Sequence, residues 1–249
     1  MEYLSINDAI AADGLRLILV RGMPSPWGQA AKAMIEYKGL DHIVGPQEPG
    51  GENSELLAWS GTNSGPVVAW QKEPPLNRWN DILFLLERLA PEKPLLPVDF
   101  DARITAMGLA HEICGELGLG WNYRLTMARP PEGKAPTPFA LKYGYNEADG
   151  SAAEDRIVRL LGNLTERVRT QKAAGSDYLL GETVTAVDFY WAAFSNLIAL
   201  MSPERCPLHP QVRPRFERVP EAIKAATNDD LIAQRDHIMD TYFRIPMEL

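Results

Sequence analysis

The chain has 249 residues, of which 45% are hydrophobic and 23% are charged, a composition typical of a globular protein with a sizeable core. Its 25 Lys and Arg residues against 33 Asp and Glu residues give a formal net charge of −8. This balance argues against a nucleic-acid partner, which favours a clustered basic face, and against binding to anionic membrane surfaces.

No segment has the pattern of a membrane span or of a secretory signal. The apolar runs fall well short of the roughly 20 residues that cross a bilayer, and the N-terminal residues carry acids without a basic stretch. Cys114 and Cys206 are isolated and form neither a CxxC motif nor a disulfide framework. We therefore expect a protein of the reducing cytoplasm.

The first strong pattern lies between Gly14 and Gly39 and predicts a strand, a turn and a helix. Residues 15–20 (LRLILV) are apolar and rich in β-forming side chains. From Pro26 the apolar residues repeat at the i, i+3, i+4, i+7 spacing of an amphipathic helix, and Gly39 ends it. This is half of a βαβ unit, in which ligands usually bind at the turn.

The rest of the first half is less strongly patterned. Residues 1–14 have the look of a short leader, residues 41–44 predict a second strand, and residues 67–70 (VVAW) predict a third. Pro66 directly precedes the third strand, where proline is tolerated only at an edge or a special bend. We therefore suspect a cis peptide bond before Pro66.

A helix and a proline-rich linker then divide the chain. Apolar positions from Ile82 to Leu89 predict the helix, and the prolines of residues 91–98 end it. All later segments have helical patterns, except for a Pro/Gly/Tyr-rich insertion at residues 130–150. We predict a first domain at residues 1–90, a linker at 91–98 and an all-helical domain at 99–249.

Two apolar stripes and one helix start mark the helical half. One stripe comprises Ile104, Met107, His111 and Cys114; the other comprises Ile157, Leu160, Leu161, Leu164 and Val168. Thr185 and Asp188 have the spacing of a capping box, and Val184 and Phe189 that of a hydrophobic staple. The residues that follow are almost wholly apolar, so we expect this helix to be buried.

Three motifs together resemble the glutathione transferase superfamily. They are Ser25-Pro-Trp-Gly-Gln29, Asn63-Ser-Gly-Pro66 and Leu179-Leu-Gly-Glu-Thr-Val-Thr-Ala-Val-Asp188. The first is similar to the S/T-P-x-G-Q of bacterial transferases related to the Nu class and to ether-cleaving relatives. The resemblance covers residues 15–245 and implies an α/β plus all-α fold: a thioredoxin-like domain that binds glutathione, followed by an all-helical substrate domain, in a homodimer.

The resemblance also implies a reaction, of the kind used in detoxification. Glutathione would be the cosubstrate, and Ser25 would favour its thiolate by donating a hydrogen bond to the sulfur. The thiolate would attack a small, largely apolar electrophile. The backbone of Gly65, before Pro66, would pair with the cysteinyl part of glutathione. Ser25 at an N-cap followed by Pro26 is also what any helix start favours, so capping is the alternative role.

The neighbours of Ser25 have two interpretations as well. Trp27 either covers the thiol site or is a packed aromatic residue, and Gln29 is expected on the exposed side of its helix. The second-substrate pocket would draw on Met107, His111, Trp121 and Tyr123, with Cys114 and the insertion's Tyr143 and Tyr145; the alternative for each is a place in the core. The remaining histidines show no metal-binding spacing, so we expect no metal.

One pair of residues departs from the family's pattern. Arg78 and Trp79 stand where the family has an acidic residue or Gln and a Ser or Thr that hold the γ-glutamyl end of glutathione. An arginine cannot accept a hydrogen bond from an ammonium group. Glutathione is then held differently, through Glu73, Asn77, Asn80 or Asp81, or it is not bound. The alternative function is a non-catalytic binding or scaffolding protein with a transferase-like fold.

Overall fold

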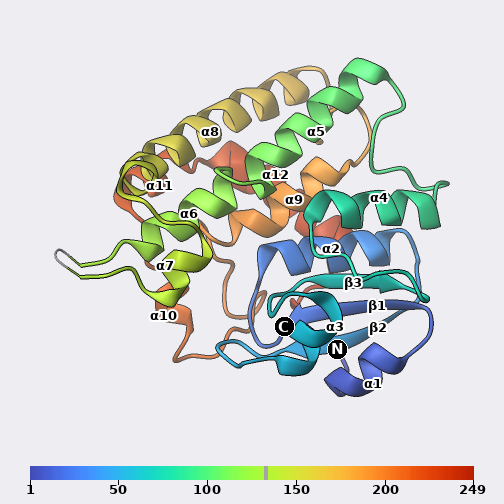
Figure 1. Ribbon diagram of the computed structural model, residues 1–249. Coiled ribbons are helices and arrows are strands. Elements are labelled where there is room, and N and C mark those ends of the chain that lie inside the picture. Colours follow the sequence, from blue (N-terminus) through green and yellow to red (C-terminus); the bar gives the residue numbers. More distant parts are fainter. Residues whose placement is uncertain (132–133) are drawn as a thin grey trace.

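A small mixed sheet forms the centre of the first half of the chain. The computed structural model describes residues 1–131 and 134–249. Within them, strand β1 (Leu15–Val20) lies between β2 (His42–Gln47), to which it is parallel, and β3 (Val67–Trp70), to which it is antiparallel (Figure 1). After β3 the chain adds one isolated bridge, between Val68 and Leu76.

Helices cover both faces of this sheet because its strands are apolar on both sides. Leu15, Leu17 and Leu19 of β1 pack toward α2 (Pro26–Tyr37) and α4 (Trp79–Leu89). On the opposite face, Ile18 packs with residues of α1 (Ile6–Ala11) and α3 (Ser54–Ser60) (Figure 1). Successive side chains of a strand point to opposite faces, so β1 supplies both layers.

The strand–turn–helix prediction is confirmed at both of its elements, and the suspected cis bond is present between Gly65 and Pro66. Gly39 follows the helix with a φ of 72°, a conformation that suits glycine. Within residues 1–14, which were expected to be a short leader before the first strand, residues Ile6–Ala11 form α1. Its N-cap, Ser5, accepts a hydrogen bond from the backbone N–H of Asp8.

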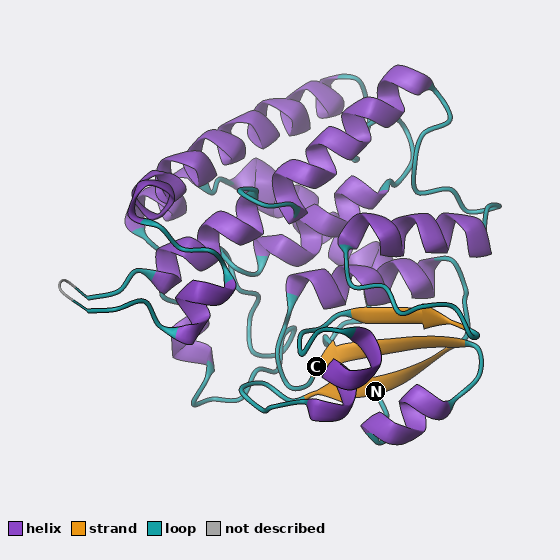
Figure 2. Cartoon of the chain, viewed as in Figure 1, coloured by secondary structure: helices purple, strands orange, loops and turns teal. Residues whose placement is uncertain are grey.

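In the second half, all the regular elements of the described residues are helices, joined by loops (Figure 2). After residues 91–98, which contain no helix or strand, the elements are α5 (Phe100–Cys114), α6 (Leu119–Ala128), α7 (Pro138–Lys142), α8 (Glu147–Ala173), α9 (Ala186–Ser195), α10 (Arg213–Phe216), α11 (Glu221–Ala226) and α12 (Asp229–Tyr242). The segment treated as an insertion thus carries α7 and the first turn of α8. The predicted stripe of α8 is buried along its whole length.

The stripe predicted for α5 is wrong at Ile104 and at His111, which are both exposed. Ile104 is 56% exposed, and the fully buried residues of this helix are Ala106, Ala110, Ile113 and Cys114. Small alanine side chains let α5 pack closely against α9. A stripe chosen by large apolar residues therefore selects a neighbouring face of the same helix.

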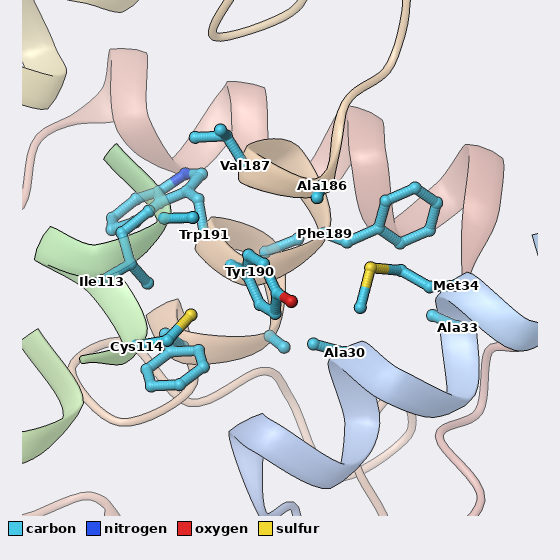
Figure 3. Packing of buried hydrophobic residues seen from close by; sticks show 14 of the residues in the cluster. Ala30, Ala33, Met34, Ile113, Cys114, Ala186, Val187, Phe189, Tyr190 and Trp191 are labelled. Atoms are coloured by element: carbon cyan, nitrogen blue, oxygen red, sulfur yellow. The ribbon is translucent and has the colours of Figure 1, made fainter. Parts of the chain in front are cut away.

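Helix α9 lies between the sheet domain and the other helices. Figure 3 shows Ala30, Ala33 and Met34 of α2 on one side of it and Ile113 and Cys114 of α5 on the other. Its start is held by Asp188, whose carboxylate accepts from the backbone N–H of Thr185 at 2.8 Å and from the Thr185 hydroxyl at 2.9 Å. The capping box and the burial expected for this helix are confirmed.

In the part of the chain that the structure describes, no helix combines the length and apolar character needed to cross a membrane.

Candidate functional site

The start of α2 presents a hydroxyl that the fold does not use. Ser25 is the N-cap residue of α2, yet its side chain makes no capping hydrogen bond and no other hydrogen bond to a described residue. The side chain is partly exposed, and Pro26 occupies the first helical position. The capping alternative for the Ser25 hydroxyl is thus unsupported by its contacts, and its catalytic role stays a prediction.

The turn before β3 lies against the strand that leads to Ser25. A Cβ atom on Gly65 would come within 3.3 Å of both the backbone N of Val20 and the carbonyl O of Ile18. Glycine therefore allows the cis-Pro66 turn to approach the end of β1 closely. A second glycine, Gly28, permits α2 to approach β1 closely, because the Cδ2 of Leu19 would lie 2.9 Å from a Cβ added to Gly28.

Trp27 is a packed residue that joins the two domains. Its Nε1 donates to the carbonyl of Cys114 at 3.0 Å, and its ring meets Phe194 edge to face with centroids 4.7 Å apart. The Arg124 guanidinium lies 5.9 Å from the centre of the same ring. Of the two interpretations made from sequence, packing describes these contacts, although part of the side chain remains exposed.

Arg78 and Trp79 behave differently from one another. Arg78 is the exposed N-cap of α4, and its side chain makes no hydrogen bond or ion pair with a described residue. The Trp79 ring turns toward the helical domain, with centroids 5.7 Å from Tyr190 and 6.4 Å from His111. The Tyr190 hydroxyl also donates to the Trp79 carbonyl at 3.2 Å. Trp79 therefore fills space between the domains.

The other predicted pocket residues do not form one wall. His111 is exposed beside Trp79, and Met107 packs partly against the core. Trp121 pairs with Tyr143 of the insertion, at 5.3 Å between centroids. Tyr123 is 4% exposed and its hydroxyl donates to the Arg218 carbonyl, so it faces the helical core. Burial raises the pKa of the Tyr123 hydroxyl.

The side chains of two further predicted residues are buried or paired elsewhere. Cys114 is buried, and burial raises the pKa of its thiol well above the ordinary value, which suits an inert core residue. Tyr145 pairs with Glu147 at the start of α8, at 2.9 Å. Gln29, expected to be exposed, is 6% exposed, because its amide donates to the carbonyl of Glu248.

Sequence reasoning missed the basic residues of this region. Lys142 of α7 reaches across to the first domain, and its Nζ lies 2.5 Å from the Ser64 hydroxyl, two residues before Pro66. Arg124 reaches Trp27 from α6. Neither residue lies in a local pattern that marks it. Among the described side chains, no three His, Cys, Asp or Glu residues are arranged to hold a metal ion.

The sequence matches no family model, and it matches no curated protein sequence. The structure, by contrast, is similar to many solved structures over most of its length. A glutathione transferase from Methylobacterium radiotolerans, in complex with glutathione sulfonate, has a TM-score of 0.57 at 18% identity, covering 92% of each chain. One from Pseudomonas putida, with one glutathione disulfide per subunit, has a TM-score of 0.62 at 16% identity, covering 92% of this chain and 87% of that one.

A third similar structure comes from Pseudomonas fluorescens and holds two glutathione molecules. It is 19% identical, with a TM-score of 0.55, and the alignment covers 90% of this chain and 92% of that chain. Such coverage includes both the sheet domain and the helical domain, in the order predicted from sequence. The protein therefore has the fold of the glutathione transferases, a thioredoxin-like domain followed by an all-helical domain.

Proposed function

We propose that the protein is a glutathione-dependent transferase that activates the thiol of glutathione for attack on a small electrophile. The observation that carries the proposal is the Ser25 hydroxyl, partly exposed at the start of α2 and without a hydrogen-bond partner among the described residues. Three of the similar structures hold glutathione or a derivative of it. The proposal places the protein in the cytoplasm, where thiols are kept reduced.

The proposed chemistry needs little more than this hydroxyl and the helix behind it. The ordinary thiol pKa is about 8.5, so most of the glutathione is protonated at pH 7. A hydrogen bond from Ser25, together with the positive end of the α2 dipole, favours the thiolate. The thiolate forms a C–S bond with the electrophile, the leaving group departs with its electron pair, and the thiol proton passes to solvent.

The test begins with titration calorimetry of the protein with reduced glutathione at millimolar concentration. Ser25→Ala should leave binding nearly unchanged, lower the rate at saturating glutathione by about tenfold or more, and raise the apparent pKa of the rate profile toward 8.5. Ser25→Thr should restore most of the rate, because it keeps the hydroxyl. An Ala variant with the full rate and an unshifted pH profile would reject the role of Ser25.

A second candidate function is favoured by Arg78 and Trp79. These residues offer no acceptor for the ammonium of glutathione, and the Trp79 ring occupies space between the domains. In this case the protein is a binding or scaffolding protein that retains the fold without glutathione. A thermal-shift series separates the two candidates, because a ligand at 100 times its Kd stabilises the folded state by about 2.7 kcal/mol. No shift at millimolar glutathione favours the second.

We further propose that the protein forms a homodimer through an apolar surface beside the linker. Val98 and Phe100 are 95% and 74% exposed, Ile104 and Phe84 are 56% and 42% exposed, and Arg103, next to Ile104, lies 6.0 Å from the centre of the Phe84 ring. Large apolar residues exposed together mark association sites. Analytical ultracentrifugation should show a dimer for the wild type and a monomer for Phe100→Glu. A wild-type monomer at micromolar concentration contradicts this proposal and leaves the enzymatic one standing.

A further inference from the structure

Two cations of the helical domain lie against the first domain, Arg124 at Trp27 and Lys142 at Ser64, and neither has a carboxylate partner among the described residues. The Arg124 guanidinium lies over the Trp27 ring, and its Nη1 lies 3.8 Å from the sulfur of Met127. Lys142 donates to Ser64. Neither forms an ion pair with any carboxylate in residues 1–131 or 134–249.

Both cations are held in place by the packing of their helices. Phe139, Tyr143 and Trp121 form a chain of aromatic contacts, at 5.0 and 5.3 Å between centroids, that fixes α7 against α6. Thr137 caps α7 by accepting from the Ala140 N–H. Lys142 ends this short helix, so the aromatic contacts fix where its side chain begins.

The same cations border the start of α2. Arg124 lies over Trp27, two residues after Ser25, and Lys142 reaches Ser64, two residues before the cis-Pro66 turn. The turn itself packs on the end of β1, the strand that leads to Ser25. The cations therefore lie beside the two segments that border the proposed thiol site.

The two positive charges also influence one another. Desolvation of its ammonium, with the nearby charge of Arg124 as the second cause, lowers the pKa of Lys142. An anion between the two would relieve this repulsion. The planar guanidinium of arginine binds a carboxylate through two parallel hydrogen bonds, and a lysine adds a point charge beside it.

We propose that Arg124 and Lys142 bind an acidic group, a carboxylate or sulfonate, on the electrophilic substrate. This inference rests on the proposed glutathione-dependent function and refines its substrate class, since the sequence suggested an electrophile that is largely apolar. The aromatic residues beside the cations suit an aryl acid. The carboxylates of glutathione itself are a second source of the same chemistry, and the experiment separates the two sources.

The experiment compares two aryl chlorides, one an acid and the other its uncharged methyl ester. Both carry two activating nitro groups; one bears a carboxylate and the other its methyl ester. In each, the glutathione sulfur bonds to the ring carbon and chloride leaves with its electron pair. The wild type should use the acid with a kcat/KM at least tenfold above that of the ester, after correction for the uncatalysed rates.

Arg124→Gln and Lys142→Gln should each raise the KM for the acid about tenfold and leave the ester and glutathione parameters unchanged. Arg159→Gln, which removes an exposed charge from α8, is the matched control and should change none of them. Equal use of acid and ester by the wild type overturns the proposal. A fall in glutathione affinity in both variants, with the acid preference intact, also overturns it and assigns the cations to glutathione.

A binding measurement keeps the inference separate from the proposed reaction. Calorimetry with a dinitrobenzoate that has no leaving group, in the absence of glutathione, should show binding that both variants weaken about tenfold and the control does not. If glutathione fails to bind but this result is obtained, the proposed function falls and the anion site stands. If glutathione reacts but dinitrobenzoate binds no better than its methyl ester, the anion site falls alone.

Discussion

The ammonium nitrogen of Lys38 lies 2.8 Å from a carboxylate oxygen of Glu87, and the Lys38 side chain is completely buried. Lys38 follows the last turn of α2, and Glu87 lies in the last turn of α4. Lys38 also donates to the carbonyls of Ala90 and Lys93, while Glu87 accepts from the backbone of residues 95 and 96. The pair thus fixes the linker to the ends of two helices.

Removing the lysine should therefore be strongly destabilising. In Lys38→Met the Glu87 carboxylate loses its cation and the carbonyls of Ala90 and Lys93 lose a donor, so we expect a loss of about 3–5 kcal/mol in the free energy of unfolding. Urea denaturation measures it, with the exposed Lys72→Met as the control. The double variant with Glu87→Gln should lose less than the two single losses added together; simple additivity would contradict the coupling.

The buried carboxyl of Asp188 should make stability fall as the pH rises. Burial raises its pKa to about 6, although hydrogen bonds from the backbone of Leu179 and Thr185 act in the opposite direction. A pKa above the unfolded value means that the folded state holds the proton more tightly. This contribution is complete below about pH 4 and is lost as the pH rises through 6.

The variant Asp188→Asn isolates this effect. It should be less stable than the wild type at every pH, because an amide cannot accept all four donors that reach the carboxylate. The difference in the free energy of unfolding should shrink between pH 4 and 6.5. Asp155→Asn, at an exposed position of α8, should show no such change. A difference that grows with pH would contradict the direction.

Glu248 should act in the opposite sense. Burial raises its pKa, but hydrogen bonds and charge from Lys32 and the N-terminal amine outweigh burial and lower the pKa to about 2, from 4.5. Its contribution is therefore present above about pH 4.5 and lost as the pH falls toward 2. Glu248→Gln should lose about 2 kcal/mol at pH 7 and nothing near pH 2. Denaturant titrations across this range measure it; an equal loss at both ends would reject the ion-pair explanation.

Gly120 should not tolerate a side chain. A Cβ there would lie 2.4 Å from Cε1 of Phe194 and 2.9 Å from Cη2 of Trp27. Gly120→Ala should therefore lose about 1–3 kcal/mol of stability and displace Trp27, which tryptophan fluorescence reports. Gly162→Ala, on α8 with no atom within 4 Å of the added Cβ, should be neutral or slightly stabilising. Equal effects of the two substitutions would show that the predicted clash is absent.

Local sequence patterns predicted the elements whose formation depends on residues close together in the sequence. The strand at Leu15–Val20, the helix at Pro26–Tyr37 and the Thr185–Asp188 capping box depend on residues a few positions apart. Helix α1 was missed because its six residues are too few to be stable alone; it forms where Ala9 packs on Gly45 of β2. Its existence depends on a contact that no local pattern records.

In the candidate site, too, features set by neighbouring residues were predicted and contacts between distant residues were not. The motif around Ser25 was visible because strand, turn and helix follow one another along the chain. Lys142 meets Ser64 across 78 residues, and Gln29 is buried by Glu248 across 219 residues. Such contacts follow from how the helices pack. The expected exposure of Gln29 is an error of this kind, and no local pattern marked the contacts of Arg124 and Lys142.

The core described around α9 has a consequence for how the molecule comes apart. One continuous apolar cluster includes Leu17 of the sheet, Ala33 of α2 and Trp191 of α9, so it extends across the predicted boundary at residues 91–98. A fragment that ended before this linker would leave the alanine face of α2 open to water. The two domains should therefore melt in a single cooperative transition. The boundary at residues 91–98 then separates two parts of the sequence but not two units that unfold independently.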